Sequence, residues 1–384
     1  MKKVYTLALA SLLLGACAQD KAVNVTVTNT LESSRTEMVE LSWNDIKDKL
    51  SLADDQTIIV LDAMGQQVTY QLVQNAATNN PQLIFQTTLD GKQDADYTIK
   101  IGTPETFDNR AKATFMPRRK DDMSWENDRV AYRMYGPALE VDPKELLVSG
   151  AIDIWCKKTS KMVTQQWYQD EFDGVKNYHT DAGEGCDFYK SGRTLGAGAA
   201  APFANDSLYY ITHNFKSYDI LENGPLRTVF ALTFEPYYAA DSVLVNETRT
   251  ISLDAGSNLN KITVDYGDIT KDIEVAAGFP YYQNANFQAN AGEGYLTYGQ
   301  PAHEKHGVIY LGVVSDDAFV STTEAQSQLL AVMNYPKSLS AQGGLTYYSG
   351  GGWDQGGFET QAIWDAYVID FAKRLRTPLQ VSVK

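Results

Sequence analysis

The chain has 384 residues, with 48 acidic and 33 basic side chains and a net charge of −15 at neutral pH. Such an acidic chain repels the phosphates of nucleic acids and anionic lipid headgroups, so we expect no nucleic-acid partner and no electrostatic docking on a membrane. Its length allows one large domain or two ordinary ones. A local basic pocket for an acidic substrate is compatible with this overall charge.

The first residues resemble a secretory signal of the lipoprotein type. Two lysines precede an apolar stretch over residues 4–14, which is too short to span a bilayer, and a Gly-Ala pair precedes Cys17. We therefore predict a signal peptide over residues 1–16, lipidation of Cys17 and a short tether over residues 17–21. The protein would then be lipid-anchored in the bacterial cell envelope, either in the periplasm or on the surface. The alternative is an ordinary signal peptide with an accidental cysteine.

Beyond the signal, the sequence is typical of an all-β protein. Aromatic and β-branched runs alternate with turns rich in Gly, Thr, Asn and Asp at intervals of roughly ten residues. Residues 22–104 predict an N-terminal β-sandwich, in which 57–61 and 68–72 are expected to form a hairpin. Residues 115–384 predict a larger set of antiparallel sheets stacked over a shared core.

Few segments of the sequence predict a helix. The segments 143–147 and 359–376 are the best helix candidates, and no second apolar segment reaches membrane-spanning length.

Cys156 and Cys186 are the only cysteines after Cys17. They either pair in an oxidising envelope or remain two buried thiols.

Histidine is scarce, with four in the chain, so each is worth weighing as an acid–base group. His179 lies in a turn rich in glycines and carboxylates, which can aim side chains into a cleft. The alternative is a histidine that is hydrogen-bonded within an ordered loop. His303 and His306 do not have the spacing of a helical zinc motif, and we expect them on a solvated loop.

Arg133 and Tyr135 are two residues apart on a predicted strand, so their side chains share one face. An arginine fork and a tyrosine hydroxyl on the same face could bind a carboxylate and move a proton. The alternative pairs Arg133 with Glu126 or Asp128 and packs Tyr135 within the sheet.

Motifs for metals and cofactors are weak. Asp181, Glu184 and Asp187 are hard oxygen ligands at close spacing, but they do not match an EF-hand loop. The glycine-rich segment 192–198 lacks the strand–helix context of a nucleotide fingerprint, and no P-loop or nucleophile elbow is present. We therefore expect neither a metal nor a cofactor. No two of the many acids can be singled out as a glycosidase pair.

Two pairs of segments resemble known families. Residues 224–230 and 247–257 resemble the central strands of galactose-mutarotase-like supersandwich proteins. Residues 125–129 and 178–185, together with the lipobox, resemble a domain-of-unknown-function family of Bacteroidota lipoproteins associated with polysaccharide utilisation. The resemblance covers nearly the whole mature chain. It implies a β-supersandwich after the N-terminal sandwich and an oligosaccharide partner that contains uronic acid, as for the ulvan oligosaccharide dehydratase in that family.

The activity implied by the resemblance is β-elimination across C4 and C5 of a uronate, by a dehydratase or a lyase. Such a reaction needs a group that neutralises the carboxylate, a base for the C5 proton and an acid for the leaving oxygen. We assign the carboxylate to Arg133, the proton transfer to His179 and the role of a second acid–base group to Tyr135. The alternatives are an aldose mutarotase or epimerase on the same fold and a non-catalytic glycan-binding lipoprotein.

Aromatic residues are candidate sugar platforms, because flat rings suit the apolar faces of sugars. Trp353 lies within a run of glycines, where a core tryptophan is unusual, and Trp155 ends a strand-like run next to a polar turn. We expect both to bind substrate, together with Glu126 and Asp181. The alternative is that these rings belong to the β-sandwich core.

Overall fold

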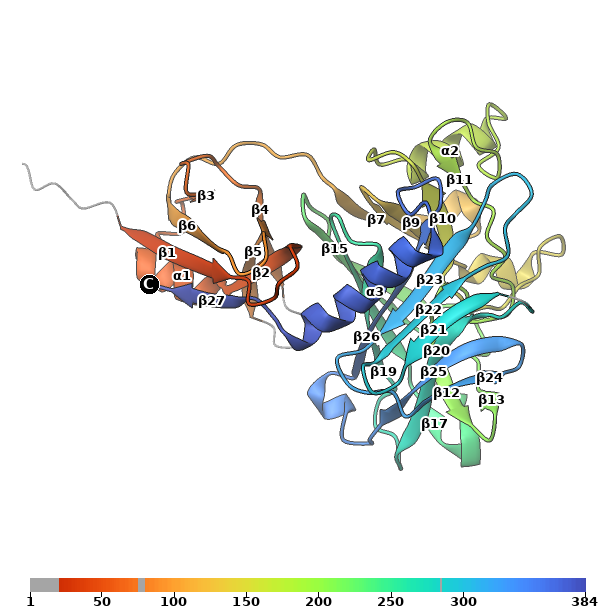
Figure 1. The fold of residues 1–384 in the computed structure, drawn as a ribbon. Helices are drawn as coiled ribbons and strands as arrows, with labels where there is room; N and C mark the ends of the chain where they lie inside the picture. The colour runs from red at the N-terminus through yellow and green to blue at the C-terminus, as the bar shows by residue number, and fades with distance from the viewer. Residues whose placement is uncertain (1–20, 75–79, 284) are drawn as a thin grey trace, which may run out of the picture.

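The computed structural model describes residues 21–74, 80–283 and 285–384 (Figure 1). The predicted signal peptide and Cys17 lie outside these residues. The strands pair antiparallel throughout the described sheets, and the described residues form the helices α1 (Trp43–Leu50), α2 (Thr164–Phe172) and α3 (Gln361–Arg376). The prediction of an all-β protein is confirmed. No helix in the described ranges has the length and hydrophobicity to cross a membrane.

The N-terminal sandwich consists of two sheets. The first sheet has the order β27-β1-β6-β3 and contains β1 (Ala22–Thr28), β3 (Ile58–Leu61), β6 (Asp94–Ile101) and β27 (Gln380–Val383). The second has the order β2-β5-β4 and contains β2 (Arg35–Ser42), β4 (Tyr70–Gln74) and β5 (Pro81–Leu89). Their inner faces and α1 enclose a separate apolar core.

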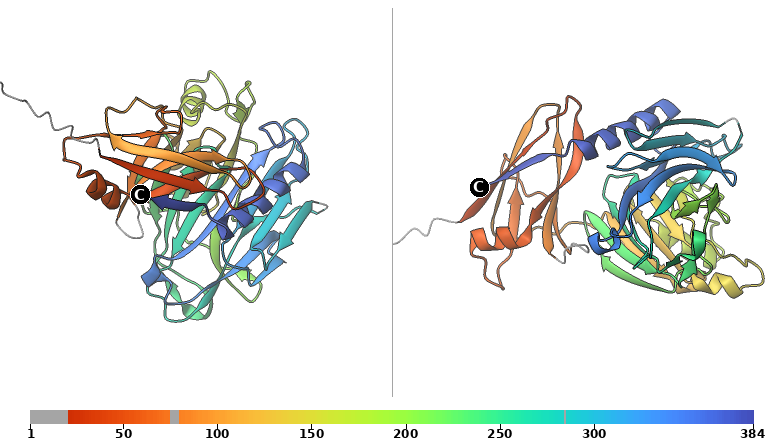
Figure 2. Two further views of the ribbon diagram at one scale, coloured as in Figure 1. Left: turned by 60° about the vertical axis from the view of Figure 1, so that its left-hand side comes forward. Right: turned by 90° about the horizontal axis from the view of Figure 1, so that it is seen from below.

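Two features of this sandwich differ from the sequence prediction. The predicted hairpin forms only next to its turn, where Leu61 bridges Gln67 and the Val68 N–H donates to the Val60 carbonyl at 2.8 Å. Beyond the turn the strands separate, because β3 pairs with β6 in one sheet and β4 pairs with β5 in the other. The turn between them therefore crosses from sheet to sheet. In addition, the C-terminal strand β27 pairs with β1, so both ends of the chain contribute to one sheet. Figure 2 shows α3 and β27 running from the larger body back to the sandwich.

The larger body contains three sheets and a two-stranded ribbon. The five-stranded sheet β11-β10-β9-β8-β7 comprises β7 (Ala111–Met116), β8 (Asp122–Asn127), β9 (Val130–Met134), β10 (Asp153–Lys157) and β11 (Gly185–Cys186). The second five-stranded sheet, β13-β12-β20-β25-β24, comprises β12 (Ala200–Ala204), β13 (Ser207–Leu208), β20 (Ile273–Pro280), β24 (Ser321–Ala325) and β25 (Gln328–Tyr335). The ribbon pairs β16 (Tyr237–Tyr238) with β17 (Leu244–Val245).

An eight-stranded sheet forms the centre of the larger body. Its order is β14-β15-β18-β19-β26-β23-β22-β21, with the strands β14 (Ser217–Glu222), β15 (Arg227–Thr233), β18 (Thr248–Asp254), β19 (Leu259–Asp265), β21 (Asn286–Asn290), β22 (Tyr295–Gly299), β23 (Ile309–Val314) and β26 (Leu345–Trp353).

One continuous apolar core joins the three sheets of the larger body. On β18, Ile251 and Leu253 are fully buried, whereas Ser252 between them is only partly buried, as expected for a strand with a period of two. Trp125 on β8 packs against Phe230 on β15, and its indole N–H donates to Asn260 Oδ1 at 2.7 Å. The sheets are therefore tied by packing and by satisfied buried polar groups.

The helices match the sequence prediction in part. α3 occupies the predicted segment 359–376 and begins with the Thr360 hydroxyl, which accepts the N–H of Ile363. Residues 143–147 form a turn rather than a helix. α2 was not predicted. The Glu126 carboxylate accepts the N–H groups of Val163 and Thr164 at its start, a cap that comes from a distant strand.

Candidate active site

A cavity of about 560 Å³ lies where the segment after α2 meets the turn before β23. It contains three of the four histidines of the chain. The residues that line it include His179, Asp187, Tyr189, Lys190, His303, Lys305 and His306. A concave site with several titratable groups is a candidate for catalysis.

His179 is held by the ends of its own loop. The Asn177 side chain accepts the His179 N–H at 2.8 Å, and the Asp187 N–H donates to the Tyr178 carbonyl at 2.9 Å. Gly185 has φ = +118°, and a Cβ there would lie 2.0 Å from the Cys156 carbonyl oxygen, so only glycine allows this loop to close on β10. The loop therefore fixes the position of a side chain that is 55% exposed.

The hydrogen bond of His179 determines its tautomer. Nδ1 lies 2.9 Å from the Asp187 carbonyl oxygen. Because a carbonyl can only accept, Nδ1 carries the proton, and Nε2 of the neutral ring has a free lone pair. His179 is thus arranged as a base through Nε2.

A tight turn brings the other two histidines together. The His303 N–H donates to the Gly307 carbonyl at 2.7 Å, and the Gly307 N–H donates back at 3.1 Å. The rings of His303 and His306 stack at 4.9 Å, and Phe188 packs against both. The segment is the exposed loop that the sequence predicts, and it also places both histidine rings at the cavity. The sequence signal for this turn was the presence of two of the four histidines, His303 and His306, next to Gly307.

His303 and His306 differ in their hydrogen bonds. The Lys305 N–H donates to His303 Nδ1 at 3.2 Å, so a neutral His303 carries its proton on Nε2. His303 is therefore a donor where His179 is an acceptor. Partial burial and then His303 lower the pKa of His306. The neutral His306 ring has Nδ1 3.6 Å from Cys186 Sγ.

Behind the cavity, Arg133 forms a buried ion-pair cluster. It is 4% exposed and binds Asp153 through Nε at 3.0 Å and through Nη2. Nη2 also lies 3.2 Å from Asp187 Oδ2, and Nη1 lies 3.8 Å from Asp122 Oδ2. Arg133 is thus engaged by three carboxyl groups and is not among the residues that line the cavity. This arrangement favours a positioning role, in contrast to the expected carboxylate clamp.

Three buried carboxyl groups around one guanidinium cannot all ionise without a large cost. Burial raises the pKa of Asp187 well above its ordinary value, and Asp153 raises it further, whereas Arg133 lowers it. Burial likewise raises the pKa of Asp153 despite Arg133. Burial and mutual repulsion therefore favour a shared proton in this cluster, which Asp187 places directly beside His179.

The raised pKa of Asp122 allows the cluster to be tested through the pH dependence of stability. Burial raises its pKa from 3.8 to about 6, although Arg133 and Arg119 act in the opposite direction. Because the folded protein holds the Asp122 proton more tightly than the unfolded chain, Asp122 favours the folded state below about pH 4. This contribution to the unfolding free energy is lost as the pH rises through about 6. Relative to Asp122→Asn, the wild type should therefore lose up to about 3 kcal/mol of unfolding free energy between pH 4 and 7.5. Urea unfolding at both pH values checks this, and parallel curves for the two proteins would contradict it.

Two further predicted site residues, Tyr135 and Trp155, lie outside the lining of the cavity. Tyr135 lies next to the cluster, with the Arg133 guanidinium 5.0 Å from its ring centre and its hydroxyl 2.8 Å from Ser191 Oγ. Burial raises its pKa, so the hydroxyl keeps its proton. Trp155 is 1% exposed and stacks between Trp167 and Tyr178. Tyr135 and Trp155 support the cavity from behind and do not line it.

Trp353 and Asp181 lie near the histidine turn, whereas Glu126 does not. The buried Trp353 indole donates to the His306 carbonyl at 2.5 Å and thus holds the turn. Burial would raise the pKa of Asp181, but the hydrogen bond from Lys158 and those from two backbone N–H groups lower it. Glu126 is 2% exposed, and Lys157 and the start of α2 occupy its carboxylate, so its position supports a structural role instead of sugar binding.

Two lysines without a carboxylate partner in the described part of the chain line the cavity. Lys190 and Lys305 line it, and neither has an ion pair within the described residues. Two acidic residues, Glu304 and Asp187, line the cavity as well, and Asp187 contacts Arg133 behind it. Sequence reasoning missed both lysines, because neither belongs to a motif. They make the cavity suited to an anionic ligand despite the net charge of the chain.

Neither a disulfide nor a metal cluster is seen at this site. Cys156 and Cys186 are opposite each other on β10 and β11 as free, buried thiols. Burial raises the pKa of Cys186 to about 12, so its thiol stays protonated. Of the three acids weighed for Ca²⁺, Asp181 pairs with Lys158 and Asp187 with Arg133. In the part of the chain that the structure describes, no three potential ligands are grouped for a metal.

Fold and site together define an all-β protein with a cavity that three histidines and two lysines line. The sequence matches the family described as a domain of unknown function, DUF4861, over residues 27–381, so the chain belongs to this family. It is similar to the uncharacterized protein P7 of Formosa agariphila, with 28% identity over 408 residues that cover 99% of this chain and 98% of that protein.

Solved structures with a similar fold come from Enterococcus faecalis. An α-mannosidase of strain V583 aligns with a TM-score of 0.50, and a protein in glycosyl hydrolase family 38 with 0.52. Both alignments have 10% sequence identity and cover 95% of this chain, but only 46% and 47% of those chains. This chain therefore spans less than half of their length, and the likeness is one of fold.

Proposed function

We propose that the protein is a carbohydrate-active enzyme that performs β-elimination on uronic-acid-containing oligosaccharides in the histidine cavity. The observation that carries this proposal is the arrangement of His179, whose Nε2 lone pair is made available by the Nδ1 contact with the Asp187 carbonyl. A fold shared with proteins named as an α-mannosidase and a family 38 glycosyl hydrolase is in keeping with a sugar ligand.

The proton transfer is assigned to His179. Nε2 takes the C5 proton, the C5–H electron pair forms the C4=C5 double bond, and the C4–O bond breaks. When the proton and the leaving oxygen are on the same face of the sugar, the His179 imidazolium can deliver the proton to that oxygen. The ring is then neutral again, and the product is an unsaturated uronate with released water or alcohol. Histidine suits both transfers because its ordinary pKa lies near neutrality.

The substrate carboxylate is assigned to the cationic side of the cavity. Lys190 and Lys305 supply positive charge, and the Nε2–H of His303 can donate to a carboxylate oxygen. These groups acidify C5–H because they stabilise the negative charge that develops on the carboxylate in the transition state. Arg133 holds Asp153 and Asp187, and through Asp187 the carbonyl that orients His179.

The test is incubation of the purified protein with defined uronate-containing oligosaccharides, followed by mass spectrometry and ultraviolet absorbance. Loss of one water with a new absorbing product indicates a dehydratase, and cleavage into an unsaturated and a saturated fragment indicates a lyase. Anomeric interconversion by NMR without either product would replace the proposal with a mutarotase. Binding without any product would replace it with a glycan-binding protein.

Lipid anchoring is a separate proposal, supported by the lipobox at Cys17. In a bacterial host that processes lipoproteins, Cys17→Ala should release the protein from the membrane fraction, because the only expected anchor is the acyl chain. Fractionation followed by immunoblotting checks this, with unchanged circular dichroism as the control for folding. A variant that partitions into membranes as fully as the wild type would contradict the anchor.

A further inference from the structure

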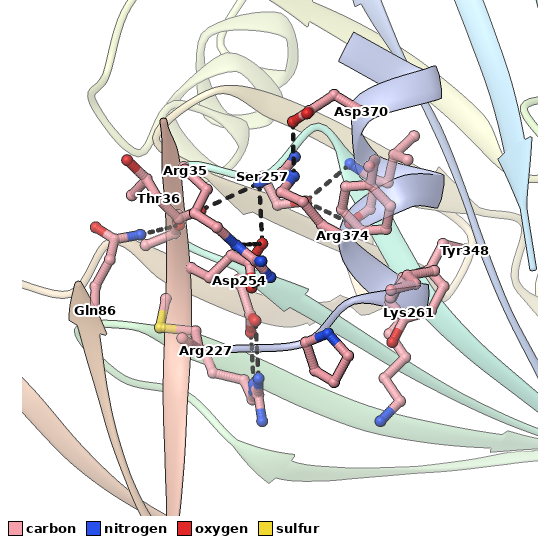
Figure 3. A pocket seen from close by; sticks show the side chains of 18 of the residues that line it. Arg35, Thr36, Gln86, Arg227, Asp254, Ser257, Lys261, Tyr348, Asp370 and Arg374 are labelled. Atoms are coloured by element: carbon pink, nitrogen blue, oxygen red, sulfur yellow. Dashed lines mark hydrogen bonds and ion pairs between the residues drawn. The ribbon is translucent and has the colours of Figure 1, made fainter. Parts of the chain in front are cut away.

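A second cavity, of about 470 Å³, lies between the N-terminal sandwich and the eight-stranded sheet. Its volume falls within the range of about 300–1,000 Å³ that is usual for small-ligand pockets. Its walls come from β2, from α3 and from the outward faces of β15, β18, β19 and β26 (Figure 3). The two cavities share no lining residue, so this one is independent of the histidine cavity.

Ion pairs fix the walls of this interdomain cavity. Arg227 on β15 bridges the two bodies, with contacts to Glu40 at 2.7 Å and to Asp254 at 2.5 Å. Burial raises the cost of ionising Glu40, but Arg227 outweighs it and lowers the pKa of that carboxyl. On the α3 side, Arg374 contacts Asp370 at 2.9 Å. The walls are therefore held by partnered charges and need no ligand for neutrality.

Lys261 is different from the other cations of the cavity. It is exposed and has no ion pair within 4 Å among the residues that the structure describes. Arg35, Arg227 and Arg374 each contact a carboxylate. Lys261 is near enough to Glu40 to help lower the pKa of that carboxyl, but Arg227 occupies Glu40 directly, so the Lys261 ammonium group can still bind an anionic ligand.

An aromatic ring lies beside Lys261. Lys261 on β19 and Tyr348 on β26 are directly opposite each other in the sheet, so both side chains lie on the same face (Figure 3). The Tyr348 ring meets Phe371 of α3 edge-on at 5.1 Å, which fixes its orientation. An ordered ring next to a free ammonium group matches a ligand with one flat apolar face and one negative group.

We propose that the interdomain cavity is a second, non-catalytic site that binds an acidic saccharide. Lys261 pairs with the carboxylate, and the Tyr348 ring packs against the apolar face of the sugar. Asp254 and Asp370, whose oxygens keep free lone pairs, accept its hydroxyl groups. This inference does not rest on the reaction proposed above, because the cavities have no residue in common.

The test measures binding of glucuronate, with glucose as the neutral probe of equal size, by saturation-transfer NMR and calorimetry. The protein is the double variant Lys190→Gln/Lys305→Gln, in which the histidine cavity has lost its free lysines. We expect glucuronate to bind and glucose to bind more weakly. Adding Lys261→Met should weaken glucuronate binding by about five- to tenfold, the size of one partly exposed ion pair with a hydrogen bond.

The matched control is Lys271→Met, which removes an exposed lysine that pairs with Asp241 at 2.8 Å outside the cavity. It should leave binding unchanged. Tyr348→Leu should weaken both probes, because it removes the ring and keeps apolar volume. Absent glucuronate binding, equal affinity for the two probes, or no effect of Lys261→Met would each overturn the inference. Lys261→Met should also leave turnover in the histidine cavity unchanged, so failure of one proposal does not imply failure of the other.

Discussion

Replacing His179 with alanine should lower turnover of a uronate-terminated oligosaccharide by about 10²–10⁴-fold, the usual contribution of a general acid–base group. The folded state should be unaffected, because the side chain is 55% exposed and belongs to a loop. Steady-state kinetics measures the effect, and circular dichroism checks folding. Added imidazole should restore part of the rate if the ring acts only as a proton carrier.

The chain offers a close control for this variant. His213 is 57% exposed and contacts Glu140 at 2.9 Å, away from the cavity. His213→Ala removes the same chemical group at the same exposure, and we expect it to keep wild-type turnover. Near-normal turnover in His179→Ala, or equal losses in both variants, would remove His179 from the mechanism.

Replacing Arg133 with methionine should lower the free energy of unfolding by about 3–5 kcal/mol, the usual cost of leaving a buried charge without its partner. Methionine fills a similar volume, so the loss reports the charge more than a cavity. Asp153 and Asp187, which contact the guanidinium, would remain in a buried site without it. The loss should be smaller at pH 4 than at pH 7.5, because burial raises the pKa of these carboxyls and protonates them first.

Urea unfolding measures this effect against Arg118→Met. Arg118 is exposed and lies over the Phe172 ring at 4.3 Å, a contact worth about 0.5–1 kcal/mol. The double variant Arg133→Met/Asp153→Asn should lose less than the sum of its single variants, because the pair is coupled. A loss near that of Arg118→Met would show that the cluster does not depend on Arg133.

Local sequence patterns identified the strands and the long helix. Alternating side chains identify strands such as β1 and β18 because each strand has one buried face, and the apolar spacing of 359–376 identifies α3. Such local patterns could not show which strands pair with each other. The segments 57–61 and 68–72 have the pattern of a hairpin, yet their strands join different sheets, because burial on one face does not specify the neighbouring strand.

The candidate site shows the same division. Scarcity and a glycine-rich turn singled out His179, and strand parity placed Arg133 and Tyr135 together, as the 5.0 Å contact between them agrees. The sequence could not show that Arg133 is enclosed by three carboxyls, two from separate strands and one from the loop after β11, which turns an expected substrate ligand into a buried support.

By itself, then, the sequence determined the all-β class, the strand positions and a histidine in a turn, because these depend on spacing along a short segment. Only the tertiary structure brought His303 and Lys305 to His179, paired β27 with β1 and placed Lys261 opposite Glu40 across two bodies. Those contacts join residues more than a hundred positions apart. They follow from how whole sheets pack, and no local pattern of residues encodes that packing.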